Sequence, residues 1–179
     1  MSAPRGPGQP VTAAGGRPAA ERIGELVRTL GLQAHPEGGL YREIFRSALQ
    51  VTRQPDGAAR SALTSIFFLL PQGACSRWHR VDADEAWHHY EGGPIELLVL
   101  LPGEDRVQPW ALGPAGSQAL PVRIVPAGAW QAARPLGAYA LAGCTVGPGF
   151  EFADFALASD LPAAQCPPAL RQRPYDALL

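Results

Sequence analysis

Three of the four histidines in this 179-residue chain lie between residues 79 and 89, together with three acidic residues. The six side chains are His79, Asp82, Asp84, Glu85, His88 and His89. A histidine beside a carboxylate can act as an acid/base pair, in which the carboxylate orients the imidazole and raises its pKa. The same residue types can instead ligate a metal. His79 and Glu85 form the strongest candidate pair of either kind.

Glycines frame this pair at regular spacing. Gly73, His79, Glu85 and Gly92 fit the first motif of the cupins: Gly, five residues, His-x-His, three or four residues, Glu, six residues, Gly. Val81 stands where the second histidine of that motif belongs. The second motif, Pro-x-Gly, two residues, then His, is matched by residues 126–131, with Gln131 in the place of the histidine. Two of the four usual metal ligands are therefore replaced.

Further segments extend the resemblance. They are His35-Pro36-Glu37-Gly38-Gly39-Leu40-Tyr41-Arg42-Glu43, residues 78–81, residues 84–88, residues 143–150 and residues 152–155. In this order they resemble the epimerase-like cupin family DUF985, over roughly residues 21–168. The resemblance implies an all-β fold, the double-stranded β-helix or cupin jelly-roll barrel, with a short N-terminal helix. It also implies that His88 faces the pocket and that Glu37 and Arg42 lie near the ligand.

Strand alternation gives a second view of the site. If His79 points inward, Arg77 and Val81 do too, and strict alternation on the next strand puts Glu85, Trp87 and His89 inward and His88 and Tyr90 outward. A β-bulge between the strands would exchange the second set. Alternation alone leaves open whether His88 or His89 faces the barrel. With the resemblance taken into account, we expect His79, Glu85 and His88 as catalytic residues. The expected ligand-binding residues are Glu37, Arg42, Arg77, Trp87, His89, Tyr90 and Gln131.

The rest of the chain predicts one domain. Residues 1–18, rich in Pro, Gly and Ala, predict a disordered tail, residues 19–168 the cupin domain, and residues 169–179 a C-terminal extension on its surface. Ala19–Leu30 predicts a helix against the outside of the barrel, and Gly31 is placed for a C-cap. Strands are expected at residues 41–47, 62–70, 77–81, 85–90, 95–101, 122–125, 131–133, 138–146 and 150–157.

Composition excludes several classes of function. No apolar run is long enough to cross a membrane, and a net charge of -1 gives no reason to expect a nucleic acid partner. The absence of lysine excludes a side-chain Schiff base. The three well-separated cysteines and the absence of a signal peptide favour the cytoplasm. The resemblance adds the expectation of a homodimer.

Three functions fit these residues. The first is metal-independent epimerisation or isomerisation of a sugar or nucleotide sugar, with His79 as base, Glu85 as its orienter, and His88 or Tyr90 as the opposing acid. The second is a non-catalytic module that binds a small, polar, sugar-like ligand. The third is a metal-dependent cupin enzyme of the oxygenase or isomerase kind, with His79, Glu85 and Gln131 as a reduced ligand set to which His88 can be added. The first two need no cofactor, and whether the protein is an enzyme stays open at this point.

Overall fold

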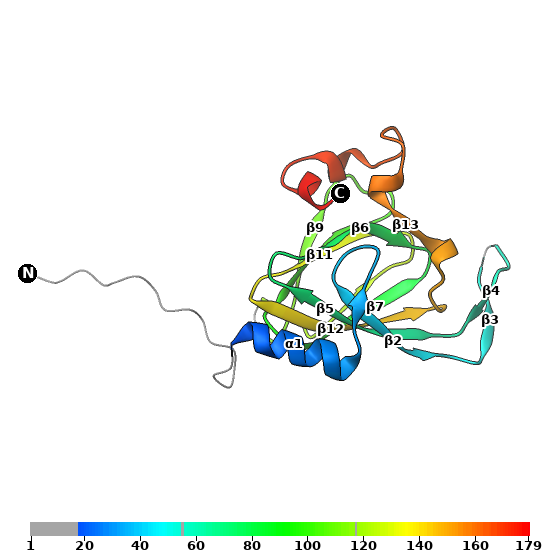
Figure 1. Cartoon of the computed structure of the whole chain (residues 1–179). Helices are drawn as coiled ribbons and strands as arrows, with labels where there is room; N and C mark the ends of the chain where they lie inside the picture. Colours follow the sequence, from blue (N-terminus) through cyan, green and yellow to red (C-terminus); the bar gives the residue numbers. More distant parts are fainter. Residues whose placement is uncertain (1–17, 55, 117) are drawn as a thin grey trace, which may run out of the picture.

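Two antiparallel sheets face each other and form a barrel, shown in Figure 1. The computed structural model describes residues 18–54, 56–116 and 118–179. This arrangement confirms the predicted all-β jelly roll with one N-terminal helix. The predicted disordered tail, apart from Pro18, lies outside the described residues. No helix in the described ranges is both long and apolar enough to traverse a membrane.

The six-stranded sheet has the order β1-β2-β5-β12-β7-β10. Its strands are β1 (Gln33–Ala34), β2 (Leu40–Arg46), β5 (Thr64–Pro71), β12 (Tyr139–Gly147), β7 (Asp84–Gly92) and β10 (Val122–Val125). The five-stranded sheet has the order β13-β6-β11-β8-β9. Its strands are β13 (Phe155–Leu157), β6 (Ser76–Val81), β11 (Trp130–Pro135), β8 (Ile95–Leu100) and β9 (Gln108–Leu112). A separate hairpin of β3 (Gln50–Thr52) and β4 (Ala59–Ser61) projects from the barrel in Figure 1.

The sheets enclose the main core. Inward side chains of both sheets meet there, with Phe68, Leu70 and Trp87 from one sheet and Leu97 and Val99 from the other. These side chains are almost completely buried. Burial of this kind stabilises the folded chain by about 1.5–3 kcal/mol for each large apolar side chain.

Helix α1 (Ala19–Leu30) covers the outer face of the six-stranded sheet. Its apolar side, with Leu26 buried, packs against Leu69 and Leu141. The helix ends at Gly31, whose left-handed backbone (φ 63°) forms the expected C-cap. Arg42 on β2 donates a hydrogen bond of 3.1 Å to the carbonyl of Leu30 and so binds the end of the helix to the sheet.

The C-terminal segment covers the outer face of the five-stranded sheet (Figure 1). It contains the 3₁₀ helices η2 (Ala158–Asp160), η3 (Pro168–Arg171) and η4 (Tyr175–Leu178). Leu170 and Leu178 pack on Trp78 and Trp130, and the Trp78 indole donates to the carbonyl of Tyr175 at 2.9 Å. These two tryptophans therefore belong to an outer layer and not to a ligand pocket.

Most predicted strands agree with the structure within two residues, and residues 150–157 are the main exception. This segment forms the 3₁₀ helix η1 (Phe152–Asp154) before the short strand β13. A continuous strand is not formed because Asp154 is held in buried ion pairs with Arg53 and Arg60, while Phe152 is 56% exposed. Strands β1, β3, β4 and β9 were not expected.

Candidate functional site

A cavity of about 300 Å³ opens between the two sheets. Its polar lining includes His35 and Glu37 from the β1–β2 loop, His79 from β6, and Glu85 from β7. Its apolar lining includes Ile66, Val81 and Val146. The cavity thus brings the titratable groups of these four residues together beside apolar walls, which is how a small-ligand site is commonly built.

A β-bulge in β6 sets which residues reach the cavity. In the pairing of β6 with β11, His79 lies opposite Gln131 and Ser76 lies opposite Ala133, so that Arg77 and Trp78 together face a single residue. The extra residue lets Ser76 and His79 both point inward although they are three apart. It also removes Arg77 from the lumen, where simple alternation placed it. The guanidinium of Arg77 instead donates to the carbonyl of Pro36 at 2.7 Å.

Glu37 is the centre of a buried hydrogen-bond cluster. One carboxyl oxygen, Oε1, accepts a hydrogen bond of 2.8 Å from the Ser76 hydroxyl. The other, Oε2, lies 3.4 Å from Nε2 of His79 and 3.4 Å from Nδ1 of His35. His79 Nδ1 lies 2.8 Å from the carbonyl of Arg77 and donates to it, which leaves Nε2 as the basic nitrogen. His35 Nδ1 accepts from the Glu37 backbone N–H at 3.3 Å.

Burial controls the charge of this cluster. It raises the pKa of Glu37 to about 8, against the opposing effects of the Ser76 hydrogen bond and of Arg77. It also lowers the pKa of His35 to about 4, with the nearby His79 contributing in the same direction. The pKa of His79 is lowered by burial as well, and the attraction of Glu85 opposes that shift without reversing it. The expected rise in the pKa of His79 was therefore wrong, because the loss of hydration outweighs the carboxylate.

Glu85 lies on the other sheet and shares a buried network with Gln131. The amide nitrogen of Gln131 donates to Glu85 Oε2 at 2.6 Å, and its amide oxygen accepts from the Trp87 indole at 3.0 Å. Burial raises the pKa of Glu85, and the charge of His79 opposes this. Burial also raises the pKa of the Cys144 thiol well above its ordinary value. Burial therefore shifts the carboxyls of this interior toward the protonated form and its imidazoles toward the unprotonated form.

The side chains do not fit the metal centre that cupins commonly carry. Val81 offers no ligand atom, and both polar ends of Gln131 are used in hydrogen bonds with Glu85 and Trp87. Over the described part of the chain, no group of three or more His, Cys, Asp or Glu residues is arranged to hold a metal ion.

The predicted site residues divide into two groups. The structure brings His79, Glu85 and Glu37 to the cavity, with Gln131 and Trp87 directly behind Glu85. It does not bring Arg42, Arg77, His88, His89 or Tyr90 to the lining. No register shift separates Glu85 from His88 in the pairing of β7 with β12, so His88 lies on the opposite face of the strand from Glu85. His89 Nε2 lies 3.1 Å from the carbonyl of Gly93.

Tyr90 lies at a bulge, since Leu141 and Ala142 of β12 pair with Glu91 and His89 and leave Tyr90 without a partner. Its ring stands edge-on to Phe67 and is 51% exposed. The two residues expected to supply an opposing acid, His88 and Tyr90, are thus both outside the cavity.

Sequence reasoning missed His35 and Ser76 as members of the cluster. The signal that could have found them is the Gly38-Gly39 pair, which follows Glu37. Gly38 has φ 110°, and a Cβ on it would lie 2.1 Å from the backbone oxygen of Cys75. Only glycine fits this contact, which presses the β1–β2 loop onto the start of β6 and thereby places Glu37 against Ser76.

The mouth of the cavity is bordered by a segment that we call the rim, residues 147–154. Phe150, Glu151 and Phe152 of the rim line the cavity. Arg46 on β2 holds the rim through Glu151 at 2.7 Å and through the carbonyl of Phe150 at 3.1 Å. The end of the rim is held from the projecting hairpin.

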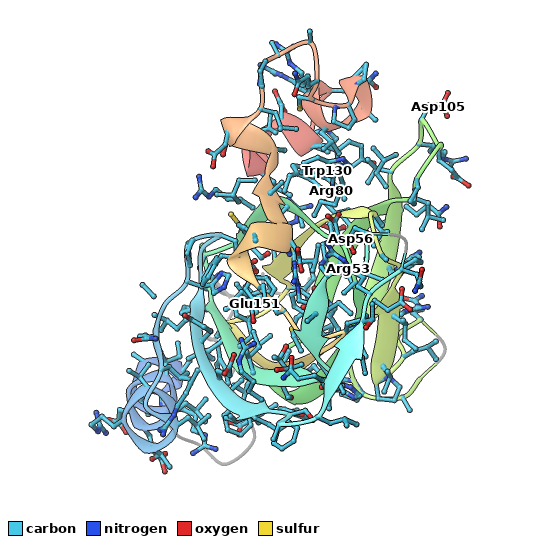
Figure 2. All side chains as sticks on the ribbon, turned by 90° about the vertical axis from the view of Figure 1, so that its right-hand side faces the viewer. Arg53, Asp56, Arg80, Asp105, Trp130 and Glu151 are labelled. Atoms are coloured by element: carbon cyan, nitrogen blue, oxygen red, sulfur yellow. The ribbon has the colours of Figure 1, made fainter. Side chains whose placement is uncertain are left out.

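Asp154 lies 2.9 Å from the guanidinium of Arg53 and 2.6 Å from that of Arg60. Arg53 also forms an ion pair with Asp56, and Figure 2 shows the two residues next to each other. The hairpin β3–β4 thus fixes one edge of the cavity without lining it.

Comparison with known proteins agrees with this architecture. The model of the cupin superfamily family DUF985 matches residues 24–158. The chain belongs to this family. A hypothetical protein from Leishmania major is 30% identical, with a TM-score of 0.67 over 74% of this chain and 85% of that one. A protein from Shewanella oneidensis is 32% identical, with a TM-score of 0.66 over 74% and 82% of the two chains.

A mutant of the oxalate decarboxylase from Bacillus subtilis shares the fold alone. It is 17% identical, with a TM-score of 0.51 over 70% of this chain and 29% of that one. No curated protein matches the chain. Membership of the cupins supports a protein that binds a small molecule in its barrel, and the reaction has to be argued from the cavity.

Proposed function

We propose that this DUF985 protein is a metal-independent epimerase or isomerase that moves a proton on a sugar-like carbon acid. The observation that carries the proposal is the buried cavity where the imidazole of His79 and the carboxyls of Glu37 and Glu85 converge. Burial shifts Glu37 and Glu85 toward the protonated acid and His79 toward the unprotonated base. Titratable groups with such opposed shifts are the mark of acid/base sites.

His79 is the base in this scheme. Its Nδ1–H is fixed on the carbonyl of Arg77, so that Nε2, which lies 3.4 Å from Glu37 Oε2, is the nitrogen that accepts a proton from a carbon next to a carbonyl group. Glu85 was expected to orient His79, but the imidazole is in polar contact with the Arg77 carbonyl, Glu37 and the Ser76 hydroxyl. Glu85 therefore takes the role of the opposing acid.

The position of Glu85 supports this role, because Glu85 lies on the sheet opposite the one that carries His79. His79 lies on β6 of the five-stranded sheet, and Glu85 lies on β7 of the six-stranded sheet. A carbon acid between them loses its proton to His79 Nε2 on one side and gains a proton from the Glu85 carboxyl on the other, which inverts the carbon. The gained proton leaves Glu85 ionised and His79 protonated, and exchange with water restores both.

A non-catalytic binding module is the second candidate. The observation that favours it is the contact between His79 and Glu37, which satisfies the base with a partner of this chain at 3.4 Å. A ligand can then bind in the cavity without taking part in any proton transfer. The two candidates share the cavity and differ only in turnover.

Exchange of ligand protons in deuterated water separates the candidates. Free sugars and nucleotide sugars are incubated with the protein, and the loss of a C–H signal is followed by proton NMR. We expect exchange in the wild type and a loss of about 10²–10⁴-fold in His79→Asn and in Glu85→Gln. His88→Asn, on the outer face of β7, is the matched control and should keep the wild-type rate.

If the ligand binds with equal affinity to the wild type and to His79→Asn and neither protein exchanges its protons, the protein is a binding module and not an enzyme.

We also infer a homodimer in the cytoplasm. Val122 and Ile124 on β10 and Tyr90 on β7 leave exposed apolar side chains on the outer face of the six-stranded sheet, beyond the part that α1 covers. A second copy of the chain is the occupant we propose for this face. The three free cysteines are consistent with a reducing compartment. Light scattering of the wild type and of Ile124→Glu tests the dimer, which should become a monomer in the variant.

A further inference from the structure

The charges around the cavity carry information on what it binds. Among the residues that the structure describes, Arg46 is the one basic side chain other than histidine that lines the cavity. Its guanidinium is bound on two sides by carboxylates, with Glu43 at 3.0 and 2.8 Å and Glu151 at 2.7 Å. Its Nη2 also donates to the carbonyl of Phe150 at 3.1 Å. These contacts use four of the five N–H donors of the guanidinium, the group with which an arginine would otherwise bind a phosphate in bidentate fashion.

The interior offers hydrogen bonds but no positive charge. Nε2 of His79 and Nδ1 of His35 are acceptors in the cluster around Glu37. Burial lowers the pKa of both histidines, so that neither is a cation at neutral pH. With Arg46 bound by two carboxylates, the cavity carries more negative than positive charge.

The apolar walls and the small volume of the cavity also favour a small uncharged ligand. Ile66, Val81 and Val146 form apolar walls, and Tyr41 and Phe152 add aromatic rings. A cavity of about 300 Å³ lies at the lower end of the range typical of small-molecule sites. A nucleotide with its base and phosphates would have to leave much of itself in solvent, on a mouth that holds Glu43 and Glu151.

We propose that the ligand of this cavity is an uncharged small molecule with hydroxyl and carbonyl groups, of the free-sugar class, and not its phosphorylated or nucleotide-linked form. The inference rests on the proposed function for the site itself, and it narrows the substrate class within it. Arg46, Glu43 and Glu151 form a charge filter at the mouth, by which we mean that their net negative charge disfavours anionic ligands. The carboxylates of Glu43 and Glu151 repel a ligand phosphate, and such repulsion costs several kcal/mol of binding free energy when like charges come close together.

The test compares matched probes on the same protein. D-Fructose is paired with D-fructose 6-phosphate, D-glucose with UDP-glucose, and inorganic pyrophosphate is added as the bare anion. Binding is read from amide chemical shifts of cavity residues in ¹H–¹⁵N NMR spectra at millimolar probe. We expect the free sugars to shift the Glu37, His79 and Glu85 signals, and each charged partner to bind at least about tenfold more weakly, a difference of about 1.4 kcal/mol.

A double variant, Glu43→Gln with Glu151→Gln, frees Arg46 and tests the filter directly. In this variant we expect the ratio of the affinity for each free sugar to the affinity for its charged partner to fall by about tenfold. Glu104→Gln changes an exposed carboxylate outside the cavity lining that accepts a hydrogen bond from Gln108, and as the control it should leave the ratio of affinities unchanged.

Tighter binding of any charged probe in the wild type would overturn the inference, as would the failure of both free sugars to shift the cavity signals. Both readouts are of binding, so they do not depend on turnover. If a free sugar binds in the cavity but exchanges no proton, the proposed enzymatic activity is wrong and the proposed ligand class is supported. If only a nucleotide sugar exchanges its proton, the enzymatic activity is supported and the proposed ligand class is wrong.

Discussion

Glu37→Gln is the most direct probe of the buried cluster, because the change keeps the shape of the side chain and removes its ionisation. A carboxyl with a pKa of about 8 in the folded chain and 4.5 as a model value keeps its proton over a range where the unfolded chain loses it. At 1.36 kcal/mol per pH unit, this difference corresponds to roughly 5 kcal/mol. The glutamine amide still accepts from Ser76 and can donate toward His79.

The sign of the effect follows from proton linkage. Below pH 4.5 the Glu37 carboxyl is protonated in both states and contributes no pH dependence. Between pH 4.5 and about 8 the folded state holds one proton more than the unfolded state, so the free energy of unfolding falls as the pH rises. We therefore expect the stability of wild type minus that of Glu37→Gln to decrease by roughly 5 kcal/mol across this window and to level off above it.

The assay is urea denaturation followed by tryptophan fluorescence at a series of pH values. Taking the difference between wild type and variant removes those parts of the contributions of His35, His79 and Glu85 that do not depend on the charge of Glu37. Glu104→Gln, whose side chain lies at the surface, should give a curve parallel to that of the wild type. A wild-type-minus-Glu37→Gln difference that stays constant from pH 5 to 8 would refute the reasoning, since Glu37 would then ionise as easily folded as unfolded.

Four further outcomes are expected. Asp154→Asn should lower the free energy of unfolding by about 3 kcal/mol, because Arg53 and Arg60 lose their buried partner, whereas the exposed Asp160→Asn should not. Glu85→Gln should lower the pKa of His79 further in an NMR titration, because it removes the attraction that opposes burial, and an unchanged pKa would show that the two groups do not interact. Purified protein should hold less than one transition metal ion per chain by mass spectrometry, and Val81→His with Gln131→His should raise that content; full occupancy in the wild type would contradict the first part. Removal of residues 1–18, which have no apolar pattern, should shift the melting temperature by no more than a few degrees, and a larger fall would show that they dock.

The barrel was predictable because its signals are local and repeated. Helix Ala19–Leu30 and its Gly31 cap follow from an apolar stripe that ends at a glycine, and β10 follows from a short segment rich in β-branched residues between turn residues. The pair His79 and Glu85 was found from motif spacing, and both residues line the cavity. In each case the evidence lies within a few residues of the element concerned.

The rest of the site depends on contacts that no local pattern reveals. The bulge at Arg77 and Trp78 exists only in the pairing of β6 with β11, and it brings Ser76 inward and takes Arg77 out. The role of Glu37 depends on the loop meeting β6 through Gly38. The pKa of His79 was misjudged because a pairwise rule for neighbouring charges ignores burial, which is a property of the whole fold.

The hold of the β3–β4 hairpin on Asp154 has a consequence for how members of this family are compared. Arg53 and Arg60 are absent from the cavity lining, yet they fix the position of the segment that borders its mouth. Two relatives with identical lining residues but different hairpins would then admit different molecules. A prediction of substrate preference that compares only lining residues would overlook the effect of the hairpin. Exchanging the hairpin between two relatives would test that effect.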